Sequence, residues 1–447
     1  MIGINWKRVV RAAFVGMMLT TVSAFVITDT AQAQYGSTKK DKKKKKASSS
    51  TKTLSPKIFK IIEDVQVLFE AEQIDQAKVM LDAIRNKNQL GPYDQTVIYQ
   101  YYGQIYAEKE QYIKSADALE VVIRLGSEFL PEEQLNSLVF NIGQLYIASD
   151  QYTKGMKYLS EWFRNNPDPS ATSLAFMASA YLAIEPADYS EALKWMLRAI
   201  DKSKAMGEEP RENWYSTLVA LYIETKQMGK SLPVLELLVE KYPKRVYWMQ
   251  LSYVYGELNR EADQFSTLQS AYHQGLLVKS SELIYLAQLY MANQIPDRAG
   301  DIMEEGIKSG RVERKPENLR FLADALYTAK ELDRAITWYE EAGKVSDNAE
   351  TYFMLGQIYM QQEEWKKAIR AFENTLSRDR QVRARKDRYG QPQKGLQSIG
   401  TAHYNLGIAL YSDGKTSAAK KSFNNAKSYK DMRPGANQWL KRIANES

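Results

Sequence analysis

The chain has 447 residues, of which 44% are hydrophobic and 26% charged, and its formal net charge is +7. It contains no cysteine and two histidines, which excludes disulfide bonds, a lipid-modified amino-terminal cysteine and cysteine-based metal or catalytic sites. Its stability must therefore come from a hydrophobic core.

The amino terminus has the pattern of an export signal. Three basic residues precede an apolar stretch of 16 residues at 12–27, and Ala31-Gln32-Ala33 places small residues where a signal peptidase reads them. We expect residues 1–33 to be a signal peptide that is cleaved after Ala33, and the mature protein to be periplasmic. An uncleaved inner-membrane anchor is the less favoured alternative, because the apolar stretch falls short of the ~20 residues that span a bilayer.

A lysine-rich segment follows the signal. Seven of the eight residues 39–46 are lysine, and residues 48–51 are Ser or Thr. Like charges cannot share a core and no apolar periodicity is present, so residues 34–56 are predicted to form a disordered arm. The signal contributes +2 to the net charge, residues 39–46 contribute +6 and Lys52 contributes +1, which leaves about −2 for the remainder. The high isoelectric point therefore belongs to the arm.

The basic arm suggests an anionic partner. We expect anionic lipid headgroups, cell-wall polymers or an acidic protein segment, whereas nucleic acid is not expected for an exported protein. The alternative is a solvated tail that keeps the molecule soluble. The residues predicted to contact an anionic surface are Lys42, Lys43, Lys44, Lys45 and Lys46.

Beyond the arm, one spacing of large and small residues recurs along the chain. Its clearest copy is Tyr352-x-x-Leu355-Gly356-x-x-Tyr359, followed by Ala368 and Phe372. Small residues at the positions of Gly356 and Ala368 let two helices approach closely, while the large residues fill the space around them. Ten copies are predicted, of which the first is weak, and they start near residues 58, 96, 136, 171, 212, 245, 280, 316, 349 and 400.

This spacing resembles the tetratricopeptide (TPR) pattern, in which each repeat is a helix-turn-helix unit of about 34 residues. The resemblance implies an all-α fold, a TPR solenoid over residues 57–447. Such repeats cannot bury their apolar faces alone, so they are expected to stack into a right-handed superhelix with a concave binding surface.

Two segments depart from the simple repeat. Residues 377–398 form an insertion rich in Arg and Lys that ends in a Gly390-Gln391-Pro392 break, which predicts an extended second helix followed by a loop. Residues 435–445 carry Trp439, Leu440 and Ile443 at helical spacing. They predict a helix that caps the open end of the stack, as a solenoid requires.

No catalytic or metal-binding constellation is present in the sequence. His273 and His403 have no spaced ligand set, and His403 stands at a first-helix position where other repeats carry Tyr or Trp. No zinc-protease, nucleophile-elbow, P-loop or dinucleotide-binding motif occurs. We predict that the protein is not an enzyme and binds no cofactor or metal.

The repeat register predicts which side chains face the concave side, one turn away from the packing positions of each first helix. Aromatic rings flanked by amides suit a partner peptide or helix, because rings cover apolar side chains and amides pair with a backbone. The alternative is that the rings pack against neighbouring first helices. The predicted set is Tyr101, Gln104, Phe140, Asn141, Gln144, Phe176, Gln250, Tyr253, Tyr285, Gln288, Phe321, Met354, Gln357, Tyr404 and Asn405.

The order of segments also carries a resemblance. An export signal, Gln34-Tyr35-Gly36-Ser37, an oligolysine arm, Leu54-Ser55-Pro56-Lys57 and a long TPR array with an Arg-rich extension resemble the periplasmic TPR proteins that accompany TonB, ExbB and ExbD. The resemblance implies a scaffold that assists TonB-dependent energy transduction and outer-membrane uptake of iron complexes or other nutrients. A periplasmic adaptor for cell-wall synthesis or envelope assembly is the alternative.

Overall fold

The computed structural model describes residues 54–85, 90–346, 348–385 and 395–446. The predicted signal peptide, residues 34–53 of the predicted arm with Lys42 to Lys46, and residues 386–394 of the insertion lie outside these ranges, whereas Pro56, the last residue of the predicted arm, already begins helix α2. The described residues form 21 helices, α2 to α22, and no strand. None of these helices has the length and apolarity needed to cross a membrane.

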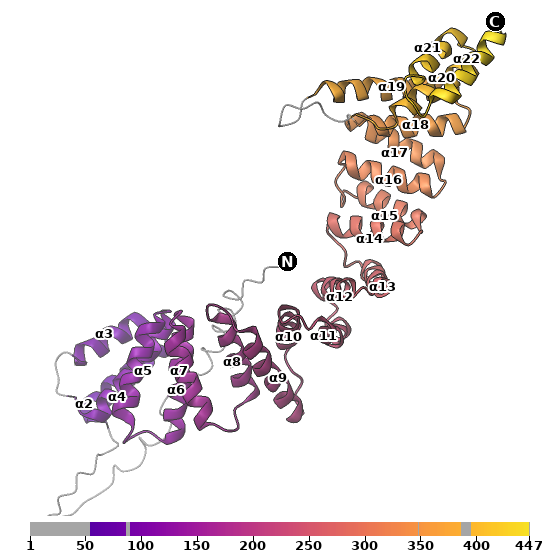
Figure 1. The fold of residues 1–447 in the computed structure, drawn as a ribbon. Coiled ribbons are helices and arrows are strands. Elements are labelled where there is room, and N and C mark those ends of the chain that lie inside the picture. The colour runs from indigo at the N-terminus through magenta and orange to yellow at the C-terminus, as the bar shows by residue number, and fades with distance from the viewer. Residues whose placement is uncertain (1–53, 86–89, 347, 386–394, 447) are drawn as a thin grey trace, which may run out of the picture. The chain divides into compact units, whose positions relative to one another are not determined.

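The chain divides into two compact units, which meet in the sequence between Tyr242 and Pro243 (Figure 1). In each repeat an even-numbered first helix is followed by an odd-numbered second helix. The helices of unit 1 are α2 (Pro56–Glu70), α3 (Ile74–Arg85), α4 (Pro92–Glu108), α5 (Tyr112–Gly126), α6 (Glu132–Ala148), α7 (Tyr152–Asn165), α8 (Ala171–Ala183), α9 (Tyr189–Ala205), α10 (Glu212–Glu224) and α11 (Met228–Lys241).

Unit 2 holds five further repeats and one final helix, and a continuous hydrophobic core runs from Phe265 to Ile443. Its helices are α12 (Arg245–Glu257), α13 (Glu261–His273), α14 (Ser280–Ala292), α15 (Pro296–Lys308), α16 (Pro316–Thr328), α17 (Leu332–Val345), α18 (Ala349–Gln361), α19 (Trp365–Ala384), α20 (Ile399–Ser412), α21 (Thr416–Ala426) and α22 (Arg433–Glu446).

The predicted repeat register is confirmed. Helices α8, α10, α12, α14, α16 and α18 begin at the predicted residues 171, 212, 245, 280, 316 and 349. Helices α2 and α4 begin somewhat earlier than predicted, at Pro56 and Pro92. Proline is favourable at the first helical position, because its fixed φ suits the helix and its missing N–H would be unpaired there anyway.

The small residues of the repeat lie where two helices cross. An ideal Cβ on Gly356 would lie 2.6 Å from the ring of Phe372, and one on Gly407 would lie 2.6 Å from the ring of Phe423. Both rings are fully buried. A glycine therefore lets a large ring of the second helix pack directly on the backbone of the first.

The turn inside each repeat has a common backbone geometry that sequence analysis missed. In nine of the ten repeats the middle residue of a three-residue turn has positive φ, and the fourth repeat has a longer turn around Pro186 instead. The amide after this residue bonds back to the end of the first helix, as Glu364 N–H does to the Tyr359 carbonyl at 2.8 Å. The nine residues are Glu72, Glu110, Asp150, Lys226, Asn259, Gln294, Lys330, Glu363 and Gly414.

This geometry predicts that glycine would stabilise most of these turns. Glu363 has φ 60°, a region that costs an L-residue about 1–2 kcal/mol, whereas Gly414 occupies the equivalent position without that cost. Glu363→Gly should therefore raise the free energy of unfolding by up to about 1 kcal/mol, and Gly414→Ala should lower it by a similar amount. Urea unfolding of both variants checks this. A loss of stability in Glu363→Gly would show that the glutamate side chain contributes more than the backbone strain removes.

Tyrosine hydroxyls link some repeats to the repeat before them. Tyr146 of α6 donates to Glu120 of α5 at 2.7 Å, and Tyr359 of α18 donates to Glu340 of α17 at 2.7 Å. Both carboxylates belong to the second helix of the preceding repeat. Burial and the adjacent carboxylate raise the pKa of both tyrosines, so the hydroxyls remain protonated donors.

The insertion begins as an extension of α19, which has 20 residues where α21 has 11. Buried Asp379 on this extension accepts hydrogen bonds from Arg383 Nε at 2.7 Å and from the backbone N–H of Leu396 at 2.5 Å. The carboxylate thus fixes the returning chain to the helix. Gly395 leaves room for this contact, because a Cβ there would lie 2.2 Å from the Asp379 carboxylate.

Helix α22 covers the last repeat. Trp439 stacks on Phe423 with ring centroids 5.5 Å apart, and its indole N–H donates to the Tyr404 hydroxyl at 3.1 Å. Ala436 and Ile443 on the same helix are buried. The apolar stripe read from the sequence is therefore the side that faces the stack.

Candidate functional site

The predicted partner-binding residues lie on first helices, as expected from the register. In unit 1, however, Asn141, Gln144 and Phe176 are buried, with 8%, 4% and 6% of their surface exposed. These three residues cannot meet a partner in this structure and are corrected to packing residues. Tyr101, Gln104 and Phe140 are half-buried.

Phe176 belongs to a cluster of aromatic rings that joins successive repeats of unit 1. Phe140 of α6 lies 4.6 Å from Trp162 of α7 and 5.6 Å from Phe176 of α8, measured between ring centroids. Tyr101 lies 5.5 Å from Phe69 of α2 in the same way. In unit 1 the alternative therefore holds, and the inner rings pack against neighbouring helices.

Unit 2 exposes part of the predicted set. Tyr253 of α12 is 50% exposed, Tyr285 of α14 is 37% exposed, and Gln288 is exposed one turn after Tyr285. These three are the most accessible of the fifteen predicted residues. The remaining predicted residues of this unit are half-buried, namely Gln250, Phe321, Met354, Gln357, Tyr404 and Asn405.

A glutamine on the intervening second helix contacts both of the first helices that carry the exposed tyrosines. Gln264 of α13 donates a hydrogen bond from its amide to the Tyr285 hydroxyl at 2.9 Å. The same amide lies against Gly256, where a Cβ would be 2.4 Å from Nε2, and Gly256 is one turn after Tyr253 on α12. We call Tyr253, Gln264, Tyr285 and Gln288 the tyrosine patch. Sequence analysis missed Gln264, which lies on a second helix.

The neighbouring first helix, α16, carries a polar cluster whose charges are already paired. Arg320 lies 3.5 Å from Asp324 and 3.5 Å from Glu350. Tyr339 donates to Asp324 at 2.5 Å. Burial raises the pKa of Asp324 despite the hydrogen bond from Tyr339 and the charge of Arg320, which both act to lower it. The cluster offers no excess positive charge to an incoming carboxylate.

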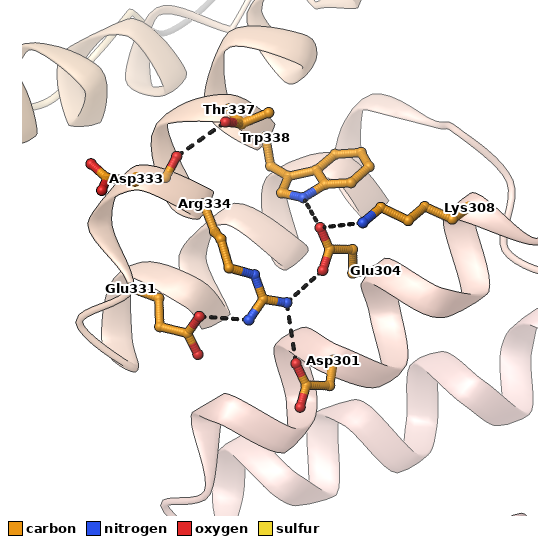
Figure 2. Close-up of polar contacts among 8 residues, drawn as sticks. All are labelled: Asp301, Glu304, Lys308, Glu331, Asp333, Arg334, Thr337 and Trp338. Carbon is orange, nitrogen blue, oxygen red and sulfur yellow. Dashed lines mark hydrogen bonds and ion pairs between the residues drawn. The ribbon is translucent and has the colours of Figure 1, made fainter.

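The second helices carry a denser network, shown in Figure 2, that joins α15 to α17. Arg334 binds Asp301 at 3.1 Å, Glu304 at 2.5 Å and Glu331 at 2.5 Å. Glu304 also accepts from the indole N–H of Trp338 at 3.0 Å and pairs with Lys308 at 2.9 Å. Every group has a partner, so the network holds consecutive repeats together. Sequence reasoning could not find it, because Arg334 and its α15 partners are 30 or more residues apart.

The described residues contain no cluster of His, Asp or Glu that could hold a metal ion. His403, the histidine in a packing position, is half-buried and stacks on Tyr429 with ring centroids 6.2 Å apart. Burial lowers the pKa of His403, although the charge of nearby Asp379 acts to raise it. Its environment is that of a neutral packing residue.

Comparison with known proteins supports the repeat assignment. Residues 353–436 match the tetratricopeptide-repeat family, and residues 307–375 match the family described as anaphase-promoting complex, cyclosome, subunit 3. None of the curated proteins matches the chain. With the helix pairs described above, the matches show that the chain folds as an all-α TPR solenoid.

Three solved structures illustrate the similarity. The chain is 19% identical to MamA over 41% of this chain and 90% of MamA, with a TM-score of 0.33. It is 14% identical to YrrB, a TPR protein with an unusual peptide-binding site, over 46% of this chain and 95% of YrrB, with a TM-score of 0.34. It is also 14% identical to the TPR2AB domain of yeast Sti1 in its pHSP90 complex, over 62% of this chain and 99% of that domain, with a TM-score of 0.33.

Proposed function

We propose that this tetratricopeptide-repeat protein is a non-enzymatic scaffold that holds a segment of a partner protein against the tyrosine patch of unit 2. The observation that carries the proposal is the exposure of Tyr253 and Tyr285, 50% and 37%, on the first helices of consecutive repeats. Single exposed hydrophobic residues are common on protein surfaces. Two exposed rings on consecutive first helices are a larger feature, and tyrosine is enriched among the residues that dominate interfaces.

The chemistry of the patch fits a polypeptide segment. The rings can cover apolar side chains, and the Gln288 amide can both donate to and accept from a backbone. Gln264 holds the Tyr285 hydroxyl in place at 2.9 Å, which reduces the conformational freedom that Tyr285 would lose on binding. Both an extended peptide and a helix present such groups.

A free carboxyl terminus is not the group that this site recognises. The following first helix, α16, carries the cation Arg320. Its guanidinium is already paired, since Asp324 and Glu350 each lie 3.5 Å from it. A carboxylate would have to compete with both acids. We therefore expect recognition through apolar side chains and backbone groups of an internal segment.

The double variant Tyr285→Ala/Gln288→Ala tests the site. Buried aromatic anchors dominate interfaces of this kind, so the dissociation constant for the partner should rise about 30-fold, equivalent to about 2 kcal/mol. The partner is first identified by photo-crosslinking from position 253, and its affinity is then measured by isothermal titration calorimetry. The melting temperature should change little, because neither side chain is buried.

Phe59→Ala is a matched control, because Phe59 is 38% exposed on α2 of unit 1 and lies outside the patch. It should leave the affinity unchanged. A different result would move the site. If the double variant binds as tightly as the wild type, and removal of the Arg-rich extension within the 377–398 insertion abolishes binding, the binding site belongs to the insertion. In that case the scaffold role stands and the tyrosine patch does not.

For the physiological setting we propose export to the periplasm and assistance of TonB-dependent uptake of iron complexes or other nutrients. The support is the sequence resemblance together with the signal pattern of residues 1–33. Lys42 to Lys46 would add an anionic contact. Capture of TonB or ExbD from position 253 supports this role, whereas capture of a cell-wall synthase supports the envelope adaptor. Fractionation of cells that leaves the protein outside the periplasm would contradict both.

A further inference from the structure

Charge is distributed unevenly along the solenoid. Residues 54–242 contain 19 Lys and Arg against 27 Asp and Glu, and residues 243–364 contain 13 against 19. Residues 365–447 reverse the sign, with 18 against 6. The net charge of −2 for the whole array therefore conceals a strongly basic carboxyl-terminal end.

The basic residues of the last repeat stand on an edge that earlier repeats bury. Ala368 and Phe372 of α19 correspond to Ala419 and Phe423 of α21, so Lys420 and Lys427 correspond to Ile369 and Leu376. Ile369 is 5% exposed and Leu376 packs against the core, because another repeat follows α19.

In the described chain α21 is followed by the single helix α22, which leaves these lysines exposed. Lys421, one residue after Lys420, is also exposed, and none of the three lysines has an ion pair within the described part of the chain. Tyr429, which is 38% exposed, lies between Lys427 and Lys430. We call Lys420, Lys421, Lys427, Tyr429 and Lys430 the basic edge.

A need for solubility does not explain the sign of this edge. Terminal repeats require a polar outer face, but residues of either charge satisfy that requirement. The first repeat carries charges of both signs on its corresponding outer face. Lys60 and Asp64 on α2 are exposed, and they occupy the repeat positions of Thr351 and Leu355, which are buried in a later repeat. On and beside the basic edge, four exposed lysines stand against one exposed acid, Asp431, which follows Lys430. A selected positive charge implies an anionic partner.

We propose that the basic edge docks on an anionic lipid surface. Lysines near a membrane with anionic headgroups each contribute separately to binding, without the paired fork geometry that a specific carboxylate or phosphate site uses. Tyrosine is enriched at the headgroup level of membranes, which suits the position of Tyr429 among the lysines. The edge lies at the end of the array, away from the tyrosine patch, so the two surfaces can be occupied together.

The test is co-sedimentation of the full mature chain with vesicles of phosphatidylglycerol and phosphatidylcholine, at low and at physiological salt. The variant Lys420→Glu/Lys421→Glu/Lys427→Glu should lower the partition coefficient about a hundredfold at low salt, and the effect should shrink as salt is added. Lys226→Glu/Lys230→Glu/Lys330→Glu is the matched control, with the same change in net charge at exposed lysines elsewhere. The lysine-rich arm is present in every variant. The difference in partition coefficient between the basic-edge variant and the control variant therefore measures the contribution of the basic edge.

The neutral variant Lys420→Gln/Lys421→Gln/Lys427→Gln guards against misfolding caused by charge reversal and should show a smaller loss in the same direction. Vesicles of pure phosphatidylcholine should bind none of the proteins. Equal partitioning of the glutamate variant and its control would overturn the proposal. So would normal vesicle binding by the glutamate variant accompanied by loss of self-association or of RNA binding, which would assign the edge to a different anionic partner.

Discussion

Replacing Glu282 by alanine is expected to lower the free energy of unfolding of unit 2 by about 2–3 kcal/mol, the cost of removing a buried carboxylate that accepts hydrogen bonds from a charged partner. The Glu282 side chain is 6% exposed and pairs with Arg245, whose Nε donates to it at 3.0 Å. Glu282 also accepts from the backbone N–H of Lys279 at 3.1 Å. The carboxylate therefore joins the starts of α12 and α14, and its removal leaves Arg245 without its partner.

Urea unfolding measures the loss, and hydrogen exchange of α12 and α14 shows whether it is local. Glu282→Gln keeps the volume and some hydrogen bonds, so it should cost less than alanine. If Glu282→Ala costs under about 1 kcal/mol, the pair behaves like an exposed surface ion pair and does not lock the two repeats together.

The effect of Glu282 should depend on pH. Burial acts to raise the pKa of this carboxyl, but hydrogen bonds from Arg245 and Lys279 outweigh it and hold the pKa below its usual 4.5. A lowered folded-state pKa means that the carboxylate stabilises the fold above the unfolded pKa, and that this stability is lost as pH falls through the folded pKa. The difference between wild type and Glu282→Ala should therefore be constant near neutral pH and shrink below about pH 4.5.

Phe372→Ala is expected to lower the free energy of unfolding by about 3–5 kcal/mol, because it removes a fully buried ring from a helix crossing and leaves a cavity there. The ring lies against Gly356, where a Cβ would be 2.6 Å away. Gly356→Ala in the wild type should therefore be destabilising despite the better helix propensity of alanine, since the buried ring must shift.

The two positions should be coupled. In the Phe372→Ala background the space beside residue 356 is free, so Gly356→Ala should become neutral or stabilising by up to about 1 kcal/mol. A double-mutant cycle from urea unfolding of all four proteins measures this. Additive effects at 356 and 372 would mean that the ring and the glycine do not share one crossing.

The repeat architecture could be predicted because its causes are local. Gly356, Ala368 and Phe372 lie within 17 residues of one another, and each helix crossing needs the same small and large residues at the same spacing. The cap could be read in the same way, from the spacing of Trp439, Leu440 and Ile443. The positive-φ turns were missed, because positions such as 110 and 330 are occupied by Glu and Lys and not by glycine, the residue that usually marks this conformation.

The accessibility of the candidate residues was predicted in part. Tyr253, Tyr285 and Gln288 are accessible in unit 2, whereas Asn141, Gln144 and Phe176 are buried in unit 1, although all six hold comparable positions on first helices. The register states which way a side chain points and says nothing of what covers it. In unit 1 the ring of Phe176, for example, packs against Phe140 of the preceding repeat.

The amino-acid sequence by itself determined the all-α repeat fold and its register, because a helix pair is specified by the periodicity of about 34 neighbouring residues. The tertiary structure alone decided which inner residues are accessible, how Gln264 bridges to Tyr285, and that Glu282 pairs with Arg245 37 residues earlier. It also decided that Lys420 and Lys427 lie on an uncovered edge. Exposure and pairing depend on side chains supplied by the next repeat, and that dependence is a property of the packed array, not of any single repeat.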